Sequence, residues 1–149
     1  MRAVVQRVDR AEVSVAGKTV ATMGTGLLAL VGVGQDDGAG DADDLARRMV
    51  TLRVFEDDAG KMNLSLLDVG GTLGVVSQFT LLGDTNQGRR PSFMAAARPA
   101  QAEPLVDRVA EAARELGAPV VTGRFGARMQ VSLVNAGPVT LLLDTTRSS

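Results

Sequence analysis

The sequence predicts one α+β domain over residues 1–149, with a mixed or antiparallel β-sheet and two main helices. Most apolar segments are short alternating stretches or brief aliphatic runs bounded by Gly, Asn or Pro, a pattern typical of strands. Only two segments repeat apolar residues at helical spacing, and both lie between predicted strands. A chain of 149 residues with 45% hydrophobic content is long enough to bury a single core.

Strands account for most of the predicted elements. Apolar and polar residues alternate over 2–15, and Gly17-Lys18 separates this segment from 19–23, as in a tight hairpin. The aliphatic run 27–33 is bounded by glycines and is too short for a typical helix, so we expect a buried strand in the middle of the sheet. Further strands are expected at 53–56, 73–82, 120–122, 129–134 and 139–144.

Two amphipathic helices are expected. Leu45, Met49 and Leu52 recur at i, i+4 and i+7 behind a group of acidic residues, which predicts a helix over about 41–53. The second helix is expected over 101–117, with Pro in its first turn and Gly at its end. Its apolar face is expected to contain Leu105, Val109, Ala112, Ala113 and Leu116.

The composition excludes several catalytic devices. The chain has no His and no Cys, so it holds no Ser-His-Asp triad, no Cys-His dyad, no zinc site of the Cys/His type and no disulfide. Any chemistry must come from hydroxyls, carboxylates, amines, backbone dipoles or the substrate. We therefore expect no metal and no cofactor.

The charge balance and the apolar segments bear on partners and location. Basic and acidic residues number 16 and 17, so binding of nucleic acid would need basic groups gathered locally. We find no signal peptide and no apolar run near the ~18 residues of a spanning helix. These features predict a soluble cytoplasmic protein that does not enter a membrane.

Two segments carry polar or irregular features within strand-like sequence. Residues 77–81 place Ser, Gln and Thr at the end of an apolar strand, where they either satisfy neighbouring backbone groups or offer hydroxyls and N–H groups to a substrate carbonyl. In 135–140, Pro138 interrupts a strand-like run, so this segment is either a plain turn or an edge, or it contains a cis bond that orients two carbonyls rigidly.

Two further segments combine arginine with an aromatic residue. An arginine beside an aromatic ring suits contact with a phosphate and stacking on a base, but both segments are also consistent with solvated loops anchored by a buried Phe. The residues concerned are Arg89, Arg90 and Phe93 in the first segment, and Arg124, Phe125 and Arg128 in the second.

A set of motifs in a fixed order resembles the bacterial D-aminoacyl-tRNA deacylase family over residues 1 to about 145. Each motif alone is weak, but together they are highly specific. The motifs are MRAVVQRV (1–8), KMNLS (61–65), SQFTL (77–81), GRRPSF (88–93), GRFG (123–126), MQV (129–131) and NAGPVT (135–140).

The resemblance implies a barrel-like fold and a homodimeric editing enzyme with its active sites at the interface. Such an enzyme hydrolyses the ester between a D-amino acid, or glycine mischarged on alanine tRNA, and the 3′ end of tRNA, and no DNA partner is implied. Gly137 and Pro138 would form a cis dipeptide whose carbonyls exclude L side chains from the partner's pocket. Arg7, Met129 and Asn135 would support this pocket.

The resemblance also implies a mechanism without a side-chain base. Thr80 aligns with a residue once considered a nucleophile, yet no acid or lysine is adjacent to it in the sequence and the chain has no His. The alternative is that the 2′-hydroxyl of the terminal adenosine assists the attack, while backbone N–H groups around Gln78 and Phe79 stabilise the oxyanion. Ser77, Gln78 and Thr80 would then position the substrate.

Two other functions are compatible with the same residues. The first is a non-catalytic module that binds the 3′ end of tRNA through the arginine-aromatic segments, with salt-dependent affinity and no hydrolysis. The second is a structural dimer without any role in RNA binding, in which the Gly and Pro features are turns.

Overall fold

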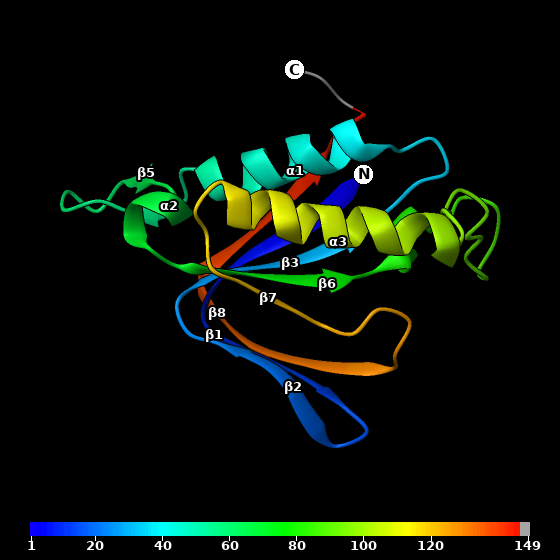
Figure 1. The fold of residues 1–149 in the computed structure, drawn as a ribbon, viewed down its shortest axis with the longest axis horizontal. Coiled ribbons are helices and arrows are strands. Elements are labelled where there is room, and N and C mark those ends of the chain that lie inside the picture. The colour runs from blue at the N-terminus through cyan, green and yellow to red at the C-terminus, as the bar shows by residue number, and fades with distance from the viewer. Residues whose placement is uncertain (147–149) are drawn as a thin grey trace.

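Two helices lie side by side over one face of a mixed sheet in the computed structural model, which describes residues 1–146 (Figure 1). They are α1 (Ala39–Thr51) and α3 (Pro99–Glu115), and they confirm the two main helices expected from the sequence. A four-residue helix α2 (Leu66–Val69) and a short 3-10 helix η1 (Phe79–Leu82) complete the helical elements of the described chain.

Strand β1 organises the sheet. It pairs with β8 along one edge and with β3 and then β2 along the other, and all these pairs are antiparallel. Strands β3, β6 and β7 follow in parallel, so the mixed sheet curls into a nearly closed barrel (Figure 1). The strands are β1 (Arg2–Val15), β2 (Lys18–Met23), β3 (Gly26–Gly32), β4 (Phe55–Glu56), β5 (Met62–Leu64), β6 (Thr72–Ser77), β7 (Val120–Thr122) and β8 (Met129–Asp144).

The hydrophobic core has two parts, separated by the sheet. Alternate residues of β3, among them Leu27 and Val31, join the larger cluster beneath α1 and α3, whereas Leu28 joins a smaller cluster on the opposite face. The run predicted at 27–33 is therefore buried on both faces, which explains its continuous aliphatic character and confirms its place in the middle of the sheet.

The extents of several predicted strands are wrong, including the one at 53–56, which is reduced to β4. The strand expected at 73–82 ends at Ser77, because its neighbour β3 ends near the same level and η1 then forms its own local hydrogen bonds. The two strands expected at 129–134 and 139–144 are one strand, β8, because long-range pairing with β1 holds both halves in the same ladder. Local sequence carries no information on such pairing.

The buried face of α3 is also rotated from the predicted one. Val109, Ala112 and Ala113 are buried as expected, but Leu116 is 44% exposed at the C-cap and Leu105 is only partly buried. Val106 is buried in place of the last leucine, which follows the final turn of α3 and therefore lies beyond the face that packs on the sheet. Among the described residues, no helix combines the length and apolar character that crossing a bilayer requires.

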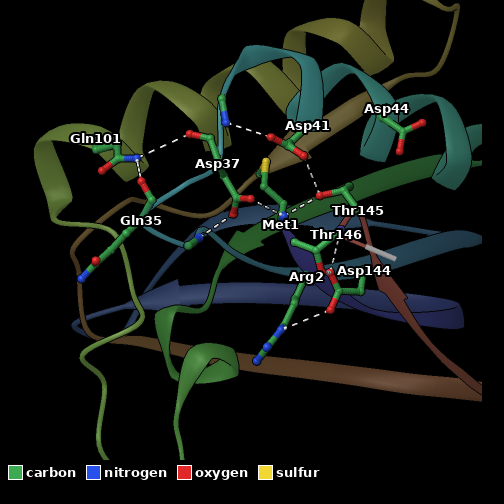
Figure 2. A network of polar contacts seen from close by, with 12 residues as sticks. Met1, Arg2, Gln35, Asp37, Asp41, Asp44, Gln101, Asp144, Thr145 and Thr146 are labelled. Carbon is green, nitrogen blue, oxygen red and sulfur yellow. Dashed lines mark hydrogen bonds and ion pairs between the residues drawn. The ribbon is translucent and has the colours of Figure 1, made fainter. Parts of the chain in front are cut away.

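The two ends of the described chain meet beside the first turn of α1 (Figure 2). The α-ammonium of Met1 donates to the hydroxyl of Thr145 at 2.6 Å and pairs with Asp37 at 2.9 Å. The Thr145 hydroxyl in turn donates to Asp41 at 2.9 Å, and the other Asp41 oxygen accepts the N–H of Gly38 at 2.9 Å. This network ties β1, β8 and α1 together.

Protonation of Asp41 is expected to destabilise the fold in acid. Its pKa lies below the usual 3.8, chiefly because the Gly38 N–H donates to the carboxylate, and the Thr145 hydroxyl acts in the same direction against partial burial. Because the pKa of Asp41 is lower in the folded state than in the unfolded state, the ionised carboxylate stabilises the fold above about pH 4. This stabilisation is lost as the pH falls through the pKa of the folded state. Asp41→Asn should therefore reduce the free energy of unfolding at pH 7 and have little effect at pH 2.

Urea unfolding at the two pH values measures this difference. The neighbouring Asp36 is exposed and makes no described hydrogen bond, so Asp36→Asn serves as the control and should change neither value. An Asp41→Asn variant that matches the unsubstituted chain at pH 7 would contradict the prediction.

Candidate active site

A cleft of about 580 Å³ opens where the end of β6, η1, α3 and the start of β8 meet. It contains six of the residues singled out in the sequence: Ser77, Gln78, Phe79, Phe93, Phe125 and Met129. Its lining carries no charged side chain, so the walls are apolar except for one hydroxyl and one amide. The chemistry of the cleft therefore depends on uncharged groups and on whatever enters it.

Two aromatic rings from distant segments meet at the mouth of the cleft. Phe79 belongs to η1 and Phe93 to the loop before α3, and their rings pack edge to face with centroids 5.1 Å apart. Phe79 remains 57% exposed, which is unusual for a phenylalanine in a globular protein. This exposed ring beside a polar strand end is a suitable surface for a flat or apolar part of a ligand.

The backbone of 77–80 presents a restricted set of donors. The N–H of Gln78 donates to the carbonyl of Val31 at 2.7 Å, so it is already used by the sheet. Phe79 and Thr80 begin η1, and in the described structure their N–H groups have no backbone acceptor. The sequence predicted that backbone N–H groups around Gln78 and Phe79 would bind the substrate. In the structure, the N–H groups of Phe79 and Thr80 are the ones open to a ligand.

The side chain of Thr80 lacks the surroundings of a nucleophile. Its hydroxyl is exposed and accepts a hydrogen bond from the Gln78 side-chain amide. Within residues 1–146, no carboxylate or amine hydrogen-bonds to it. An amide donor does not remove a proton, so the geometry provides no base for Thr80.

The Gly137-Pro138 segment lies apart from the cleft of its own chain. The peptide bond is cis, and both residues are exposed in an excursion of β8 in which 136–139 oppose only Arg7 of β1. Gly137 has a φ of +132°, and a Cβ added there would lie 2.9 Å from the Arg7 guanidinium. Only glycine suits this position.

Arg7 and Asn135 hold this excursion from its two sides. Arg7 donates through Nε to the carbonyl of Ala136 at 2.9 Å and through Nη1 to that of Val54 at 2.7 Å. Asn135 bridges the base of the excursion, accepting the N–H of Val139 at 2.8 Å and donating to the Thr140 hydroxyl at 2.9 Å. Both residues thus support the Gly-Pro segment and not the cleft. Of the three residues expected to support the pocket, Met129 alone lines the cleft.

Removal of the Arg7 guanidinium is expected to destabilise the fold. Arg7→Met leaves two carbonyls without their charged donor, and hydrogen bonds of this kind contribute about 1.5–3 kcal/mol each. We expect urea unfolding to give a loss of about 2–4 kcal/mol, since the two contributions are not strictly additive. Arg10→Met is the matched control, because the Arg10 side chain is exposed on the same strand and makes no described hydrogen bond, and the change should cost less than about 0.5 kcal/mol. Equal losses in the two variants would contradict the role given to Arg7.

The basic residues divide into two groups around the cleft. Arg124 and Arg128 flank the turn 125–127 that lines it, and Arg98 precedes α3. Arg89 and Arg90 lie in the exposed loop closed by the Asp84–Ser92 bridge and do not line the cleft. In the described chain none of these five arginines forms an ion pair, whereas Arg2, Arg47, Arg48, Arg108 and Arg114 all do.

One wall of the cleft was not identified from the sequence. It consists of small and branched apolar side chains from β3, the loop before α3 and α3 itself: Val31, Val33, Ala97, Pro99, Ala102 and Val106. Such residues at helix and strand spacing are indistinguishable from core residues in a single sequence. Only the gap between α3 and the sheet makes them a binding surface.

The perturbed ionisable groups lie outside the cleft. Backbone N–H donors lower the pKa of Asp57 and of Asp68, each in a turn or helix cap, and Arg108 has a raised pKa because it hydrogen-bonds to Asp43. No group of acidic side chains in the described part of the chain is arranged to hold a metal ion.

Comparison with known proteins identifies the class. The family model described as D-Tyr-tRNA(Tyr) deacylase matches residues 4–144. The D-aminoacyl-tRNA deacylase of Chloroflexus aurantiacus is 59% identical over 145 residues, covering 97% of this chain and 91% of that protein. The enzyme of the same name from Thermomicrobium roseum is 57% identical, with coverages of 97% and 94%.

Two solved structures share the fold. The c-Myc DNA Unwinding Element Binding Protein superposes with a TM-score of 0.91 at 39% identity, covering 97% of this chain and 98% of that one. A probable eukaryotic D-amino acid tRNA deacylase gives a TM-score of 0.82 at 19% identity, with coverages of 95% and 97%. The second comparison bears on the fold alone.

The family match and the relatives above place the chain in a class of hydrolases that act on an ester bond. The chain belongs to the D-Tyr-tRNA(Tyr) deacylase family, and its reaction is the deacylation of D-aminoacyl-tRNA. The resemblance seen in the sequence motifs is thereby confirmed.

Proposed function

We propose that the cleft hydrolyses the ester that joins a D-amino acid, or glycine on alanine tRNA, to the terminal ribose of tRNA, in a cytoplasmic homodimer. The observation that carries the proposal is the segment 77–80, which brings a hydroxyl, an amide and free N–H groups to the mouth of a cleft without charged side chains. Such a site suits a reaction in which the substrate supplies the reactive hydroxyl and the protein stabilises the oxyanion.

In the proposed reaction, water adds to the ester carbonyl carbon and the bond to the ribose oxygen breaks. The N–H groups of Phe79 and Thr80 stabilise the negative charge on the carbonyl oxygen, since the N–H of Gln78 is engaged with Val31. The ribose 2′-hydroxyl assists proton transfer from the water, and the departing ribose oxygen receives a proton. Ser77 and the Gln78 side chain orient the amino acid.

Selection against L substrates is proposed to come from Gly137 and Pro138 of the partner subunit. Ser77 of β6 pairs with a residue of β3 that in turn pairs with Ala3 of β1. The Gly-Pro motif instead opposes Arg7, which is four residues further along β1. At about 3.3 Å per residue, the motif is offset from Ser77 of its own chain by about 13 Å along the strand direction. Rigid carbonyls on one side of the bound α-carbon leave room for hydrogen but not for a side chain, and glycine passes on either side.

Exposed apolar side chains next to the cleft favour the binding of a second copy of the chain on that face. Leu142 is 79% exposed and lines a groove of about 520 Å³ with Leu81 of η1 and with Arg2. Apolar side chains gathered in this way are typical of subunit interfaces. A partner seated here would lie directly beside the mouth of the cleft, as a shared active site requires.

The arginines without ion pairs support RNA as the substrate's carrier. Arg98, Arg124 and Arg128 are next in sequence to residues that line the cleft, and Arg89 and Arg90 lie in the loop just before Phe93 of the lining. An arginine with no carboxylate partner has its N–H donors free for a phosphate, and no neighbouring negative charge offsets its attraction. The chain thus gathers locally the basic groups that its overall net charge of −1 does not supply.

A side-by-side deacylation assay tests the proposed function. With no metal added, the protein should release D-amino acid and glycine from tRNA more than about a hundredfold faster than the matching L-amino acid, because rejection is steric. Equal rates on the D and L esters would refute the selection mechanism. RNA binding that weakens with salt but releases no amino acid would favour a non-catalytic module that binds the 3′ end of tRNA.

A further inference from the structure

A series of polar contacts joins Met1, at the start of the chain, to Asp37, and Gln101 of α3 to Gln35 (Figure 2). Gln35 in turn contacts the loop that carries Phe93, one ring of the aromatic pair at the mouth of the cleft. We propose that Asp37 is a positioning residue for the active site, because it holds the turn 34–37 against the loop 92–97 that carries Phe93. Its effect on turnover rests on the proposed function, whereas its effect on Phe93 does not.

Asp37 is held by both of its carboxylate oxygens. One oxygen lies 2.9 Å from the α-ammonium of Met1, and the other accepts the N–H of Gly34 at 2.6 Å. The N–H of Asp37 also donates to the Gly34 carbonyl at 3.2 Å. The Asp37 side chain is 7% exposed and the Met1 side chain is buried, so water competes little with the ion pair. The turn is therefore restrained to one conformation.

The turn transmits this restraint to the loop through Gln35. The Gln35 N–H donates to the carbonyl of Ala95 at 3.2 Å, and its side-chain amide donates to the carbonyl of Met94. From α3, the Gln101 amide donates to the Gln35 carbonyl at 2.7 Å and clamps the turn from the other side (Figure 2). A further backbone hydrogen bond between the same two segments runs from the N–H of Ala97 to the carbonyl of Val33 at 2.9 Å. The loop thus depends on the turn for its backbone partners.

The loop in turn positions the exposed ring of the cleft. Phe93 immediately precedes Met94, and its ring packs against Phe79 with the two planes at 72°. It also packs on Gly83, where an added Cβ would lie 2.9 Å from the ring. Phe79 is next to Gln78 in the cleft, so displacement of Phe93 changes the surface on which the substrate rests.

The four phenylalanines of the chain make a selective probe of this coupling. Protein labelled with 4-fluorophenylalanine gives one ¹⁹F signal for each, assigned by single Phe→Leu variants. In Asp37→Asn, the signals of Phe79 and Phe93 should shift or broaden, while that of Phe55, which is buried in the core, should stay. Asp36→Asn, an exposed neighbour, is the control and should move none of them.

The kinetic readout separates positioning from general destabilisation. Asp37→Asn should raise KM for D-aminoacyl-tRNA by about tenfold with a smaller change in kcat, because the displaced surface binds substrate without taking part in bond breaking. A purely structural role would instead lower the active fraction and leave KM unchanged. That second result would overturn the assignment of Asp37 as a positioning residue.

A second variant decides the matter if Asp37→Asn does not fold. Gln101→Ala removes the clamp on Gln35 from an exposed position and leaves the buried ion pair intact. It should shift the same two ¹⁹F signals, less strongly. Unmoved signals of Phe79 and Phe93 in a folded variant would overturn the coupling, and this result does not depend on whether the protein hydrolyses any tRNA ester.

Discussion

Replacement of the 2′-hydroxyl of the terminal adenosine by hydrogen is expected to reduce the enzymatic deacylation rate by about 10²–10⁴-fold, the usual contribution of a positioned proton-transfer group. The expectation follows from the cleft, whose lining has no side chain able to take a proton from water. Because the 2′-hydroxyl also affects spontaneous ester hydrolysis, each rate should be divided by the rate of the same substrate in buffer. Pre-steady-state assays with saturating enzyme then report the chemical step.

The same mechanism predicts a small effect at Thr80. Thr80→Val keeps the shape and removes a hydroxyl that accepts only the Gln78 amide, so the rate should fall by no more than about tenfold. The assignment would be reversed if the deoxy substrate lowered the deacylation rate by tenfold or less while Thr80→Val lowered it strongly. That result would make the threonine a nucleophile.

Mixing two inactive variants is expected to restore about half of the native activity if each active site combines two subunits. Gly137→Ala strains a residue at φ +132° and places its Cβ 2.9 Å from the Arg7 guanidinium, so it should distort the selection motif. Ala127→Trp fills the cleft with an indole from a turn that lines it. We expect each variant homodimer to lose about 10²-fold in D-aminoacyl-tRNA deacylation, Ala127→Trp because the indole blocks the cleft, and Gly137→Ala because a displaced motif intrudes on the bound α-carbon of D as well as of L substrates.

In the mixed dimer, one site combines both defects and the other has neither. Co-expression with two different tags and sequential purification isolates this species, and one intact site in two should return about half of the native rate. The control is a doubly tagged dimer that carries Ala127→Trp in both subunits, which should stay inactive. A mixed dimer no more active than its parents would mean that the motif does not act across an interface.

The local part of the fold could be predicted from the sequence. The hairpin 2–23 and the buried run 27–33 follow from alternation and flanking glycines, and α1 from the spacing of Leu45 and Met49. The limits of 73–82 could not be predicted, because the end of β6 depends on where β3 stops pairing. The same holds for β8, which is one strand only because β1 pairs with both of its halves.

The candidate site was predictable in its chemistry and only partly in its composition. Ser77, Gln78 and Phe79 stood out as polar or aromatic side chains at a strand end, and they line the cleft. The apolar wall from α3 could not be recognised, because Ala102 and Val106 have the spacing of ordinary core residues. That the N–H of Gln78 is engaged with Val31 depends on pairing between strands, which sequence does not reveal.

The sequence by itself determined what kind of chemistry this protein can perform. A chain without His or Cys has no imidazole and no thiol, whatever its fold, and its motifs indicated the family. Only the tertiary structure decided which groups meet. It packed Phe79 against Phe93 and set Gly137 apart from the cleft of its own chain. It also paired the N–H of Gln78 with the sheet and left the N–H groups of the next two residues without a backbone acceptor. The reason is physical, since residue types set the available reactive groups, whereas strand register and helix packing over long sequence distances set their geometry.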